Sequence, residues 1–311
     1  MSSKIIAVAG PTASGKTAIS IALARFFGGE IVSADSMQIY RRLDIGTAKA
    51  TPEEQSLAPH HMIDIVDPEE DYSVDRYVQD ASLICDSLLS AGKLPVLTGG
   101  TGLYIDSLLS GRDFGASGDP ELRSRLEAQY NQLGGEAMLT ELALFDPERA
   151  SILHPGDMKR IIRAFEVYIL SGETITAHDE RTKALPPRYD ALFIIPVYRS
   201  RELLYSAIDS RVDSMVSAGL FEEVEALLAS GIRESSTALQ AIGYKEPIMA
   251  LKGIISREEA VALIKQSSRR YAKRQLTWFS RRTDALRVYH EDFQDFNSMC
   301  EYVIEYIKEK L

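Results

Sequence analysis

The amino-acid sequence predicts an α/β fold in which a parallel sheet core is flanked by helices and interrupted by a helical insertion. Three observations support this class. Short apolar runs recur without polar alternation, helical patterns separate them, and a complete phosphate-binding motif follows the first run. Runs of this kind form strands that are buried on both faces, as in parallel sheets covered by helices.

The predicted strands are spread along the whole chain. They comprise residues 5–9, 30–33, 94–98 and 191–197, with a last candidate at 286–289. Helices are expected over residues 17–27, 201–218, 221–230 and 257–280. The first three of these helices are followed directly by glycines, at positions 28, 219 and 231, which is typical of helix C-termini.

Two stretches rich in helix breakers, residues 111–118 and 184–188, divide the chain. The segment between them has helical patterns throughout. It begins with Asp119-Pro120, where the acid can cap a helix and the proline can occupy its first turn. Helices are expected over 121–133, 136–145 and 157–170. We therefore predict an α/β core from residues 1–113 and 187–311 and a helical insertion domain over 114–186.

Residues 10–17, Gly-Pro-Thr-Ala-Ser-Gly-Lys-Thr, match the phosphate-binding consensus G-x-x-x-x-G-K-[ST] in full. Its glycines let backbone N–H groups point into one concavity at a helix N-terminus, where Lys16 adds a charge and Thr17 offers a hydroxyl to Mg²⁺. The predicted phosphate-binding residues are Gly10, Thr12, Ala13, Ser14, Gly15, Lys16 and Thr17. The motif predicts a P-loop NTPase-like core that binds a polyphosphate or pyrophosphate, and it leaves the identity of that ligand open.

The composition is that of an ordinary soluble globular protein, with 45% of its 311 residues hydrophobic and 26% charged. No apolar run approaches the ~18 residues of a membrane helix, and the first strand leaves no room for a cleaved signal. Cys85 and Cys300 lie outside any C-x-x-C spacing, which suits a reducing compartment. These features predict a cytoplasmic protein without a membrane partner.

The net charge of −10 argues against a general nucleic-acid binder. Residues 265–287 depart from this average, because they carry eight Lys and Arg side chains against the single acid Asp284. A solvated basic helix face is one interpretation of this segment, and an anion-binding face is the sharper one.

Two polar residues follow strands at the sheet edge that the phosphate loop marks. Asp35 follows the second strand, and Thr101 follows the Gly-Gly pair after the third. Because ligands bind beyond the carboxyl ends of parallel strands, both side chains are expected near the phosphate. Asp35 could act as a general base, hold Mg²⁺ through water, or cap a turn. The third strand lacks the acid of an ordinary ATPase, and no Asn-Lys-x-Asp motif indicates a GTPase.

Seven segments through nearly the whole chain resemble, in order, those of bacterial tRNA dimethylallyltransferases. They are GPTASGKT (10–17), DSMQIY (35–40), DIGTAK (44–49), PHHMID (59–64), GGTGLY (99–104), QAIGYKE (240–246) and YAKRQLTWF (271–279). The phosphate loop alone is shared by many enzymes, whereas the set is highly specific. The resemblance implies transfer of a dimethylallyl group from dimethylallyl diphosphate to the exocyclic N6 of the adenine at tRNA position 37, next to the anticodon, with release of pyrophosphate.

The resemblance also implies roles for individual residues. Asp35 is expected as the general base with Thr101 beside the reacting groups, while the phosphate loop and Mg²⁺ at Thr17 stabilise the leaving pyrophosphate. Arg211, Lys273 and Arg274 are expected as further pyrophosphate contacts. The residues expected to contact tRNA are Asp35, Ser36, Met37, Gln38 and Thr101 at a flipped adenine, and Arg123, Lys159, Arg160, Ile161, Ile162 and Arg163 in the insertion. The implied partners are the tRNA anticodon stem-loop and dimethylallyl diphosphate, bound by a monomer.

Four positions depart from the family pattern. Arg42 stands where glycine is common, Ala50 where proline is usual, Gly156 in place of asparagine and Ser280 in place of arginine. These differences concern loop shape and RNA contact. The pair His60-His61 is interpreted as structural, because adjacent histidines point different ways. Three alternatives remain open: a small-molecule kinase that uses ATP at the phosphate loop, a non-catalytic RNA-binding protein, and a prenyltransferase that acts on free adenine nucleotides.

Overall fold

The computed structural model describes residues 4–112, 114 and 118–311. The chain divides into two compact units, one of Met1–Leu109 with Arg188–Leu311 and the other of Ser110–Pro187. The insertion predicted over 114–186 falls inside the second unit. Residues 113 and 115–117, at the predicted first boundary, lie outside the described residues.

The described part of the first unit contains one six-stranded sheet. Its strands are β1 (Lys4–Ala9), β2 (Glu30–Ser33), β3 (His60–His61), β4 (Pro95–Gly99), β5 (Asp190–Val197) and β6 (Leu286–Tyr289). Their order is β3-β2-β4-β1-β5-β6, and every neighbouring pair is parallel. The predicted α/β class is therefore confirmed, and the candidate strand at 286–289 forms the edge beside β5.

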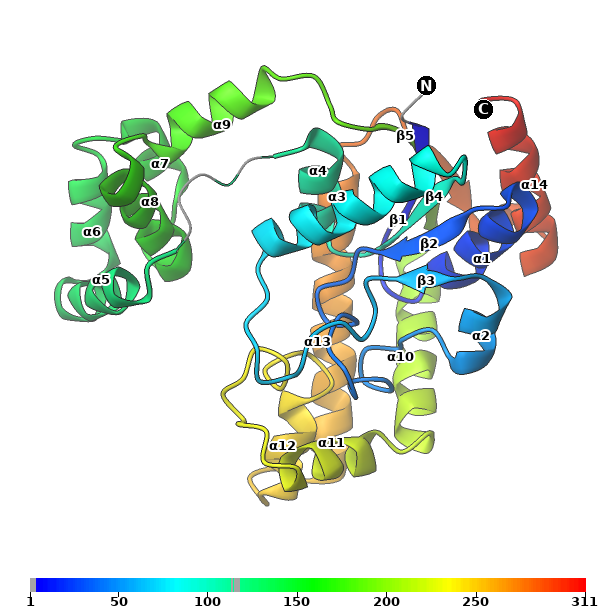
Figure 1. The fold of residues 1–311 in the computed structure, drawn as a ribbon. Coiled ribbons are helices and arrows are strands. Elements are labelled where there is room, and N and C mark those ends of the chain that lie inside the picture. Colours follow the sequence, from blue (N-terminus) through cyan, green and yellow to red (C-terminus); the bar gives the residue numbers. More distant parts are fainter. Residues whose placement is uncertain (1–3, 113, 115–117) are drawn as a thin grey trace. The chain divides into compact units, whose positions relative to one another are not determined.

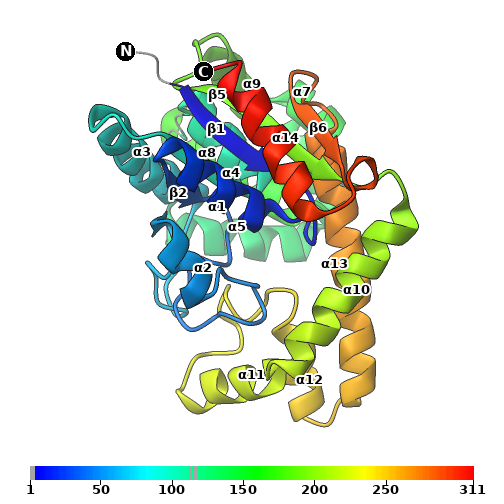
Figure 2. The same ribbon diagram turned by 90° about the vertical axis from the view of Figure 1, so that its right-hand side faces the viewer.

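Helices cover both faces of the sheet (Figures 1 and 2). On one face, α1 (Lys16–Phe27) and α14 (Phe296–Lys308) pack on β1, and Ile6, Ile19 and Val303 share one buried cluster. On the other face lie α3 (Val74–Ser90) and α4 (Gly102–Ser110), whose Tyr77 and Tyr104 rings stack 4.1 Å apart. Each buried Ile or Leu side chain stabilises such a layer by about 1.5–3 kcal/mol.

A second group of helices extends beyond the carboxyl edge of the sheet (Figure 1). It comprises α2 (Pro52–Leu57), α10 (Arg201–Ser217), α11 (Leu220–Ala229), α12 (Lys245–Leu251) and α13 (Arg257–Phe279). The helices predicted over 201–218, 221–230 and 257–280 correspond closely to α10, α11 and α13. A capping box starts α13, since Ser256 accepts from the Glu259 N–H and Glu259 accepts from the Ser256 N–H.

The second unit is helical in its described part. Its helices are α5 (Pro120–Leu133), α6 (Gly135–Leu142), α7 (Pro147–Ile152), α8 (Met158–Ser171) and α9 (Ile175–Lys183). Asp119 caps α5 as predicted, because its carboxylate accepts from the N–H groups of Glu121 and Leu122. The sequence analysis missed α7 and α9, which are short and have few apolar residues facing a core.

The two-residue strand β3 was also missed. His61 Nε2 donates to the Glu30 carboxylate at 2.6 Å, and Lys93 pairs with the same carboxylate. Hydrogen bonds from Lys93 and His61 lower the pKa of Glu30 below its ordinary value. His61 thus fastens β3 to β2, in keeping with the structural interpretation of the histidine pair. Among the described residues, no helix is long and apolar enough to cross a membrane.

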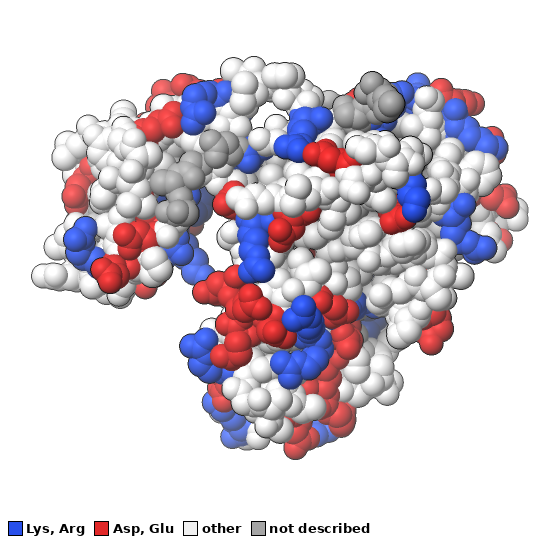
Figure 3. Space-filling model, in the orientation of Figure 1, with Lys and Arg blue, Asp and Glu red and all other residues white. Residues whose placement is uncertain are grey.

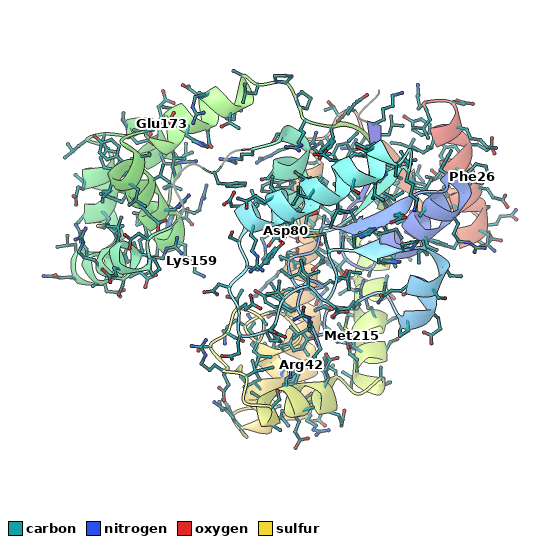
Figure 4. All side chains as sticks on the ribbon, viewed as in Figure 1. Phe26, Arg42, Asp80, Lys159, Glu173 and Met215 are labelled. Atoms are coloured by element: carbon teal, nitrogen blue, oxygen red, sulfur yellow. The ribbon has the colours of Figure 1, made fainter. Side chains whose placement is uncertain are left out.

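Arg42 has a backbone conformation that favours glycine. Its φ is +66°, in the left-handed region that L-residues adopt at a cost of about 1–2 kcal/mol. Its side chain is exposed and donates to Ser230 Oγ at 3.2 Å (Figure 4). Of the other three departures from the family pattern, Ala50 is buried before α2, Gly156 lies near His154, and Ser280 caps the C-terminus of α13.

Glycine at position 42 should therefore make the protein more stable than alanine does. Both Arg42→Gly and Arg42→Ala remove the hydrogen bond to Ser230, so the pair differs only in the backbone preference. We expect Arg42→Gly to exceed Arg42→Ala by about 1 kcal/mol in the free energy of unfolding, measured in urea. Equal stabilities would show that the left-handed conformation at this position carries no cost.

Candidate active site

A cavity of about 520 Å³ lies at the carboxyl edge of the sheet, within the first unit. It is bounded by the phosphate loop, the segment after β2, the end of β4, and the facing sides of α10 and α13. Its polar lining residues include Lys16, Thr17, Asp35, Gln38, Arg211 and Arg274, and its apolar lining residues include Ile208, Val212, Met215, Ile242 and Ile264. The cavity thus joins an anion-binding end to an apolar wall.

The phosphate loop has the backbone geometry that its sequence predicts. Gly10 has φ +150° and Gly15 has φ +78°, so both glycines take conformations that a side chain would oppose. The ring of Phe296 in α14 fills the place where a Cβ on Gly15 would lie. His290 Nε2 donates to the Ser14 carbonyl at 3.1 Å, and Lys16 Nζ donates to the Pro11 carbonyl at 2.6 Å. The conformation of the loop is therefore fixed by contacts with Phe296 and His290 and by a hydrogen bond within the loop itself.

The cations of the cavity are electrostatically strained. The pKa of Lys16 is lowered to about 7, chiefly by burial and to a lesser extent by repulsion from Arg211, while Asp35 opposes that shift. Burial also lowers the pKa of Arg211, and Asp35 and Glu54 oppose it. Since desolvated positive charges are stabilised by an anion, this end of the cavity suits a phosphate or pyrophosphate.

The structure separates the two predicted pyrophosphate contacts on α13. Arg274 lines the cavity, whereas Lys273 does not. A helix turns about 100° per residue, so position 273 lies about opposite the face formed by Ser268, Tyr271 and Gln275. Lys273 is exposed and is not a wall residue of this cavity.

The basic segment at 265–287 proves to be heterogeneous. Lys265 and Arg269 pair with Asp213 and Asp209 of α10, at 2.6 and 2.5 Å. Arg282 pairs with Asp106, and Arg287 donates to backbone carbonyls at the end of α13. On the face shown in Figure 3, Lys and Arg side chains are interspersed with Asp and Glu. Three of the eight basic side chains are thus paired with acids of neighbouring helices, and Arg274 lines the cavity.

Asp35 and Thr101 lie on adjoining loops. Asp35 Oδ1 accepts from the N–H groups of Met37 and Gln38 at 2.9 and 3.3 Å, which fixes its carboxylate at the cavity wall. Thr101 Oγ1 accepts from the Ser36 N–H at 3.1 Å, and the Thr101 N–H donates to the Ala34 carbonyl at 3.2 Å. Asp35 lines the cavity, whereas Thr101 is not among its lining residues and contacts the segment that carries Asp35 through Ser36.

The Gln38 side chain is oriented by the segment 44–48. Its Nε2 donates to the carbonyls of Thr47 and Ala48 at 3.3 and 3.2 Å, and its Oε1 accepts from Ser33 Oγ at 3.3 Å. That segment is itself fixed by Glu223 of α11, whose carboxylate accepts from the N–H groups of Asp44, Ile45 and Gly46 at 3.0, 2.8 and 3.2 Å.

Glu223 is one of the residues that the sequence analysis missed. Tyr244 supports it by donating to its Oε1 at 2.7 Å, and a Cβ on Gly46 would overlap the Tyr244 ring. The matching segments 44–49 and 240–246 gave a signal, since they contain Gly46 and Tyr244. No pattern in the sequence, however, pairs either segment with a carboxylate of α11.

The residues predicted in the helical unit fall into three groups. Ile161 and Ile162 are buried in its core, so their side chains are not available to tRNA. Arg123 and Arg163 both pair with the buried carboxylate of Glu166, at 2.9 and 2.7 Å.

Lys159 and Arg160 form the third group. Both are exposed near the start of α8, and Arg160 pairs with Asp157 at 3.1 Å (Figure 4). Arg123 is exposed as well, but its guanidinium pairs with Glu166, so Lys159 and Arg160 are the exposed cations of the predicted set that lie outside that pairing.

Comparisons with known proteins match the chain over its whole length. The family model for IPP transferases matches residues 38–282, and that for isopentenyl transferases matches residues 3–63. The tRNA dimethylallyltransferase of Caldanaerobacter subterraneus subsp. tengcongensis is 43% identical over 313 positions, covering 100% of this chain and 99% of that relative. The one from Shouchella clausii is 43% identical over 307 positions, covering 98% and 97%.

Solved structures agree with these relatives. The tRNA isopentenylpyrophosphate transferase of Bacillus halodurans superposes with a TM-score of 0.74 at 39% identity, covering 99% of this chain and 96% of that one. A eukaryotic dimethylallyltransferase described as acting on tRNA gives a TM-score of 0.79 at 28% identity, covering 96% and 77%. The chain therefore belongs to the IPP transferase family, whose relatives named here are tRNA dimethylallyltransferases.

Proposed function

We propose that the protein transfers a dimethylallyl group from dimethylallyl diphosphate to N6 of the adenine at tRNA position 37, releasing pyrophosphate. One observation carries the proposal. A single cavity holds an anion-binding loop with Lys16, Arg211 and Arg274, and Asp35 lies in the wall of that same cavity. Departure of a diphosphate and removal of a proton can therefore take place side by side.

The anion-binding end stabilises the leaving group. As the bond from C1 of the donor to the bridging oxygen breaks, negative charge grows on the pyrophosphate. Backbone N–H groups of the phosphate loop, together with Lys16 and Arg274, line the cavity where that charge develops and stabilise it. Burial destabilises the charged form of Lys16 before the diphosphate binds. Binding of the diphosphate then stabilises this charge, which adds to the free energy of binding.

Asp35 serves as the base. The N6 amine is a weak nucleophile, since its lone pair is delocalised into the purine. In the proposed step the N6 nitrogen bonds to C1, pyrophosphate leaves with the electron pair of the C1–O bond, and Asp35 accepts the N6 proton. The contacts of Asp35 Oδ1 with two backbone N–H groups fix the orientation of the carboxylate. A base in this position contributes roughly 10²–10⁴-fold.

Mg²⁺ is the expected cofactor, and the donor set suits it. This ion prefers few protein ligands together with phosphate oxygens and waters. The Thr17 hydroxyl lines the cavity, and the described residues contain no group of three or more His, Cys, Asp or Glu that would form an all-protein cage. We assign Thr17 as its protein ligand, where the ion would add positive charge to the pyrophosphate oxygens.

The tRNA substrate is recognised by two sets of residues in this proposal. Ser36, Met37 and Gln38 hold the flipped adenine, with the Gln38 amide fixed in orientation by Thr47 and Ala48. In the helical unit, Lys159 and Arg160 contact the backbone phosphates. Arg123 and Arg163 have their main role in neutralising Glu166 inside that unit.

Incubation with unmodified tRNA, dimethylallyl diphosphate and Mg²⁺ should yield dimethylallyl adenosine at position 37, detected by mass analysis of the nucleosides. Asp35→Asn should lower kcat by roughly 10²–10⁴-fold and leave tRNA affinity within about twofold. Asp67→Asn, in the exposed loop before α3, serves as the matched control and should keep wild-type kcat. Phosphorylation of a metabolite without tRNA modification, or modification of free adenine nucleotides alone, would refute the proposal.

The affinity for dimethylallyl diphosphate should fall as the pH rises. The protonated form of Lys16 binds the diphosphate, and its pKa in the free protein is about 7. Above that pH the proton must be taken up on binding, so KM should rise by up to about tenfold per pH unit between pH 8 and pH 9. In Lys16→Arg the guanidinium stays charged, so its KM should be higher but independent of pH. Parallel profiles for the two proteins would contradict the assignment.

Removing Lys159 and Arg160 should weaken tRNA binding in a salt-dependent manner. For every phosphate that is no longer neutralised, the slope of log affinity against log salt should decrease in magnitude by about 0.7–0.9. We expect the double variant Lys159→Ala/Arg160→Ala to show a shallower slope in filter binding and an unchanged KM for dimethylallyl diphosphate. Arg125→Ala, an exposed cation on α5, is the control. An identical slope in the double variant and the control would exclude these contacts.

A further inference from the structure

Gln275 of α13 joins two loops that the proposed reaction uses. Its Oε1 accepts from the Thr12 N–H in the phosphate loop at 2.9 Å, and its Nε2 donates to the Gly100 carbonyl after β4 at 3.0 Å. The side chain is 5% exposed. Only one orientation of the amide satisfies both backbone partners, so the contacts fix the residue as an amide and fix which way it faces.

The loop after β4 leaves space for the Gln275 amide. A Cβ on Gly100 would overlap Gln275 Nε2, and φ at Gly100 lies outside the left-handed region. The glycine is therefore required by the close approach of Gln275, since the backbone there would accept any L-residue. Gly100 immediately precedes Thr101, whose Oγ1 accepts from the Ser36 N–H beside Asp35.

The C-terminal end of α13 is fastened to the same segment. Trp278 Nε1 donates to Asp106 Oδ2 at 2.7 Å, and Arg282, just beyond the helix, pairs with the other oxygen of Asp106. A Cβ on Gly102 would overlap the Trp278 ring. Positions 275 and 278 share one side of the helix, so α13 is seated along residues 100–106 where Gln275 reaches across to Thr12.

We propose that Gln275 is a positioning residue that sets the distance between the pyrophosphate-binding loop and the Thr101–Asp35 unit. This inference rests on the proposed transfer reaction. The carbon that is attacked is attached to the diphosphate held by the phosphate loop. The proton is removed by Asp35, whose segment is linked to the loop after β4 by the hydrogen bond from the Ser36 N–H to Thr101. An error of about 1 Å between the two can cost about 100-fold in rate, even when each substrate still binds.

Gln275→Met, which keeps the side-chain volume and removes both hydrogen bonds, tests the proposal. We expect kcat to fall by about 10- to 100-fold, while KM for tRNA and the Kd of inorganic pyrophosphate with Mg²⁺ change by less than about threefold. Gln266→Met, on the exposed side of the same helix, is the matched control. All rates are taken per folded molecule from the unfolding curve, and Gln275→Asn replaces Gln275→Met if the latter fails to fold.

A double-mutant cycle tests the link to Gly100. Gly100→Ala should displace the Gln275 amide and lower kcat to a similar extent, whereas the same change in a Gln275→Ala background should have little further effect. A kcat for Gln275→Met within twofold of wild type, or fully multiplicative effects in the cycle, would overturn the inference. Wild-type protein that modifies no tRNA would instead overturn the proposed function.

Discussion

The parallel pairing of β1 with β4 is the constraint on which the rest of the site depends. In this register Ala9 lies beside Gly99, so the phosphate loop and the Gly-Gly-Thr loop leave the sheet at the same level. The pairing of β2 with β4 then sets Ser33 beside Thr98 and brings Asp35 to the same edge. A shift of one residue in either register would turn side chains to the opposite face of the sheet. Three loops that are far apart in sequence thus meet because of backbone hydrogen bonds within the sheet.

The geometry at this edge is reinforced by contacts between backbone and side chain. Thr101 connects to Ser36, Gln38 to the carbonyls of residues 47 and 48, and Glu223 to three successive N–H groups. Side chains that satisfy buried backbone groups fix the loops more tightly than packing alone, since an unsatisfied partner costs about 1–3 kcal/mol. Glycines at 46, 99 and 100 give the room that this close approach demands. The facing sides of α10 and α13 close the remaining side of the cavity.

The charges that line the cavity favour the binding of an anion and lower the stability of the free protein. Lys16 and Arg211 are desolvated and repel each other, and Asp35 relieves this only in part. Elsewhere two cations of α13, Lys265 and Arg269, pair with acids of α10. A chain with a net charge of −10 can therefore present positive charge in this cavity. Positive charge is left under-compensated where an anion is expected and neutralised where helices pack.

The α/β class, the strands at 5–9, 30–33, 94–98, 191–197 and 286–289, and the phosphate loop could be predicted from the amino-acid sequence, because these depend on local apolar runs and on glycines at fixed spacing. The sequence also indicated Asp35 and Thr101, since both follow strands that end at one sheet edge. Which basic residues face the cavity depends on how α13 packs: Arg274 lines it and Lys273 does not, although they are adjacent in sequence. Tertiary packing likewise decides the environment of Ile161 and Ile162. They are adjacent in sequence to exposed cations, but their side chains are buried in the core of the helical unit. The contacts of Gln275 with Thr12 and Gly100 cross 263 and 175 positions of the chain, and no local pattern encodes a hydrogen bond over such separations.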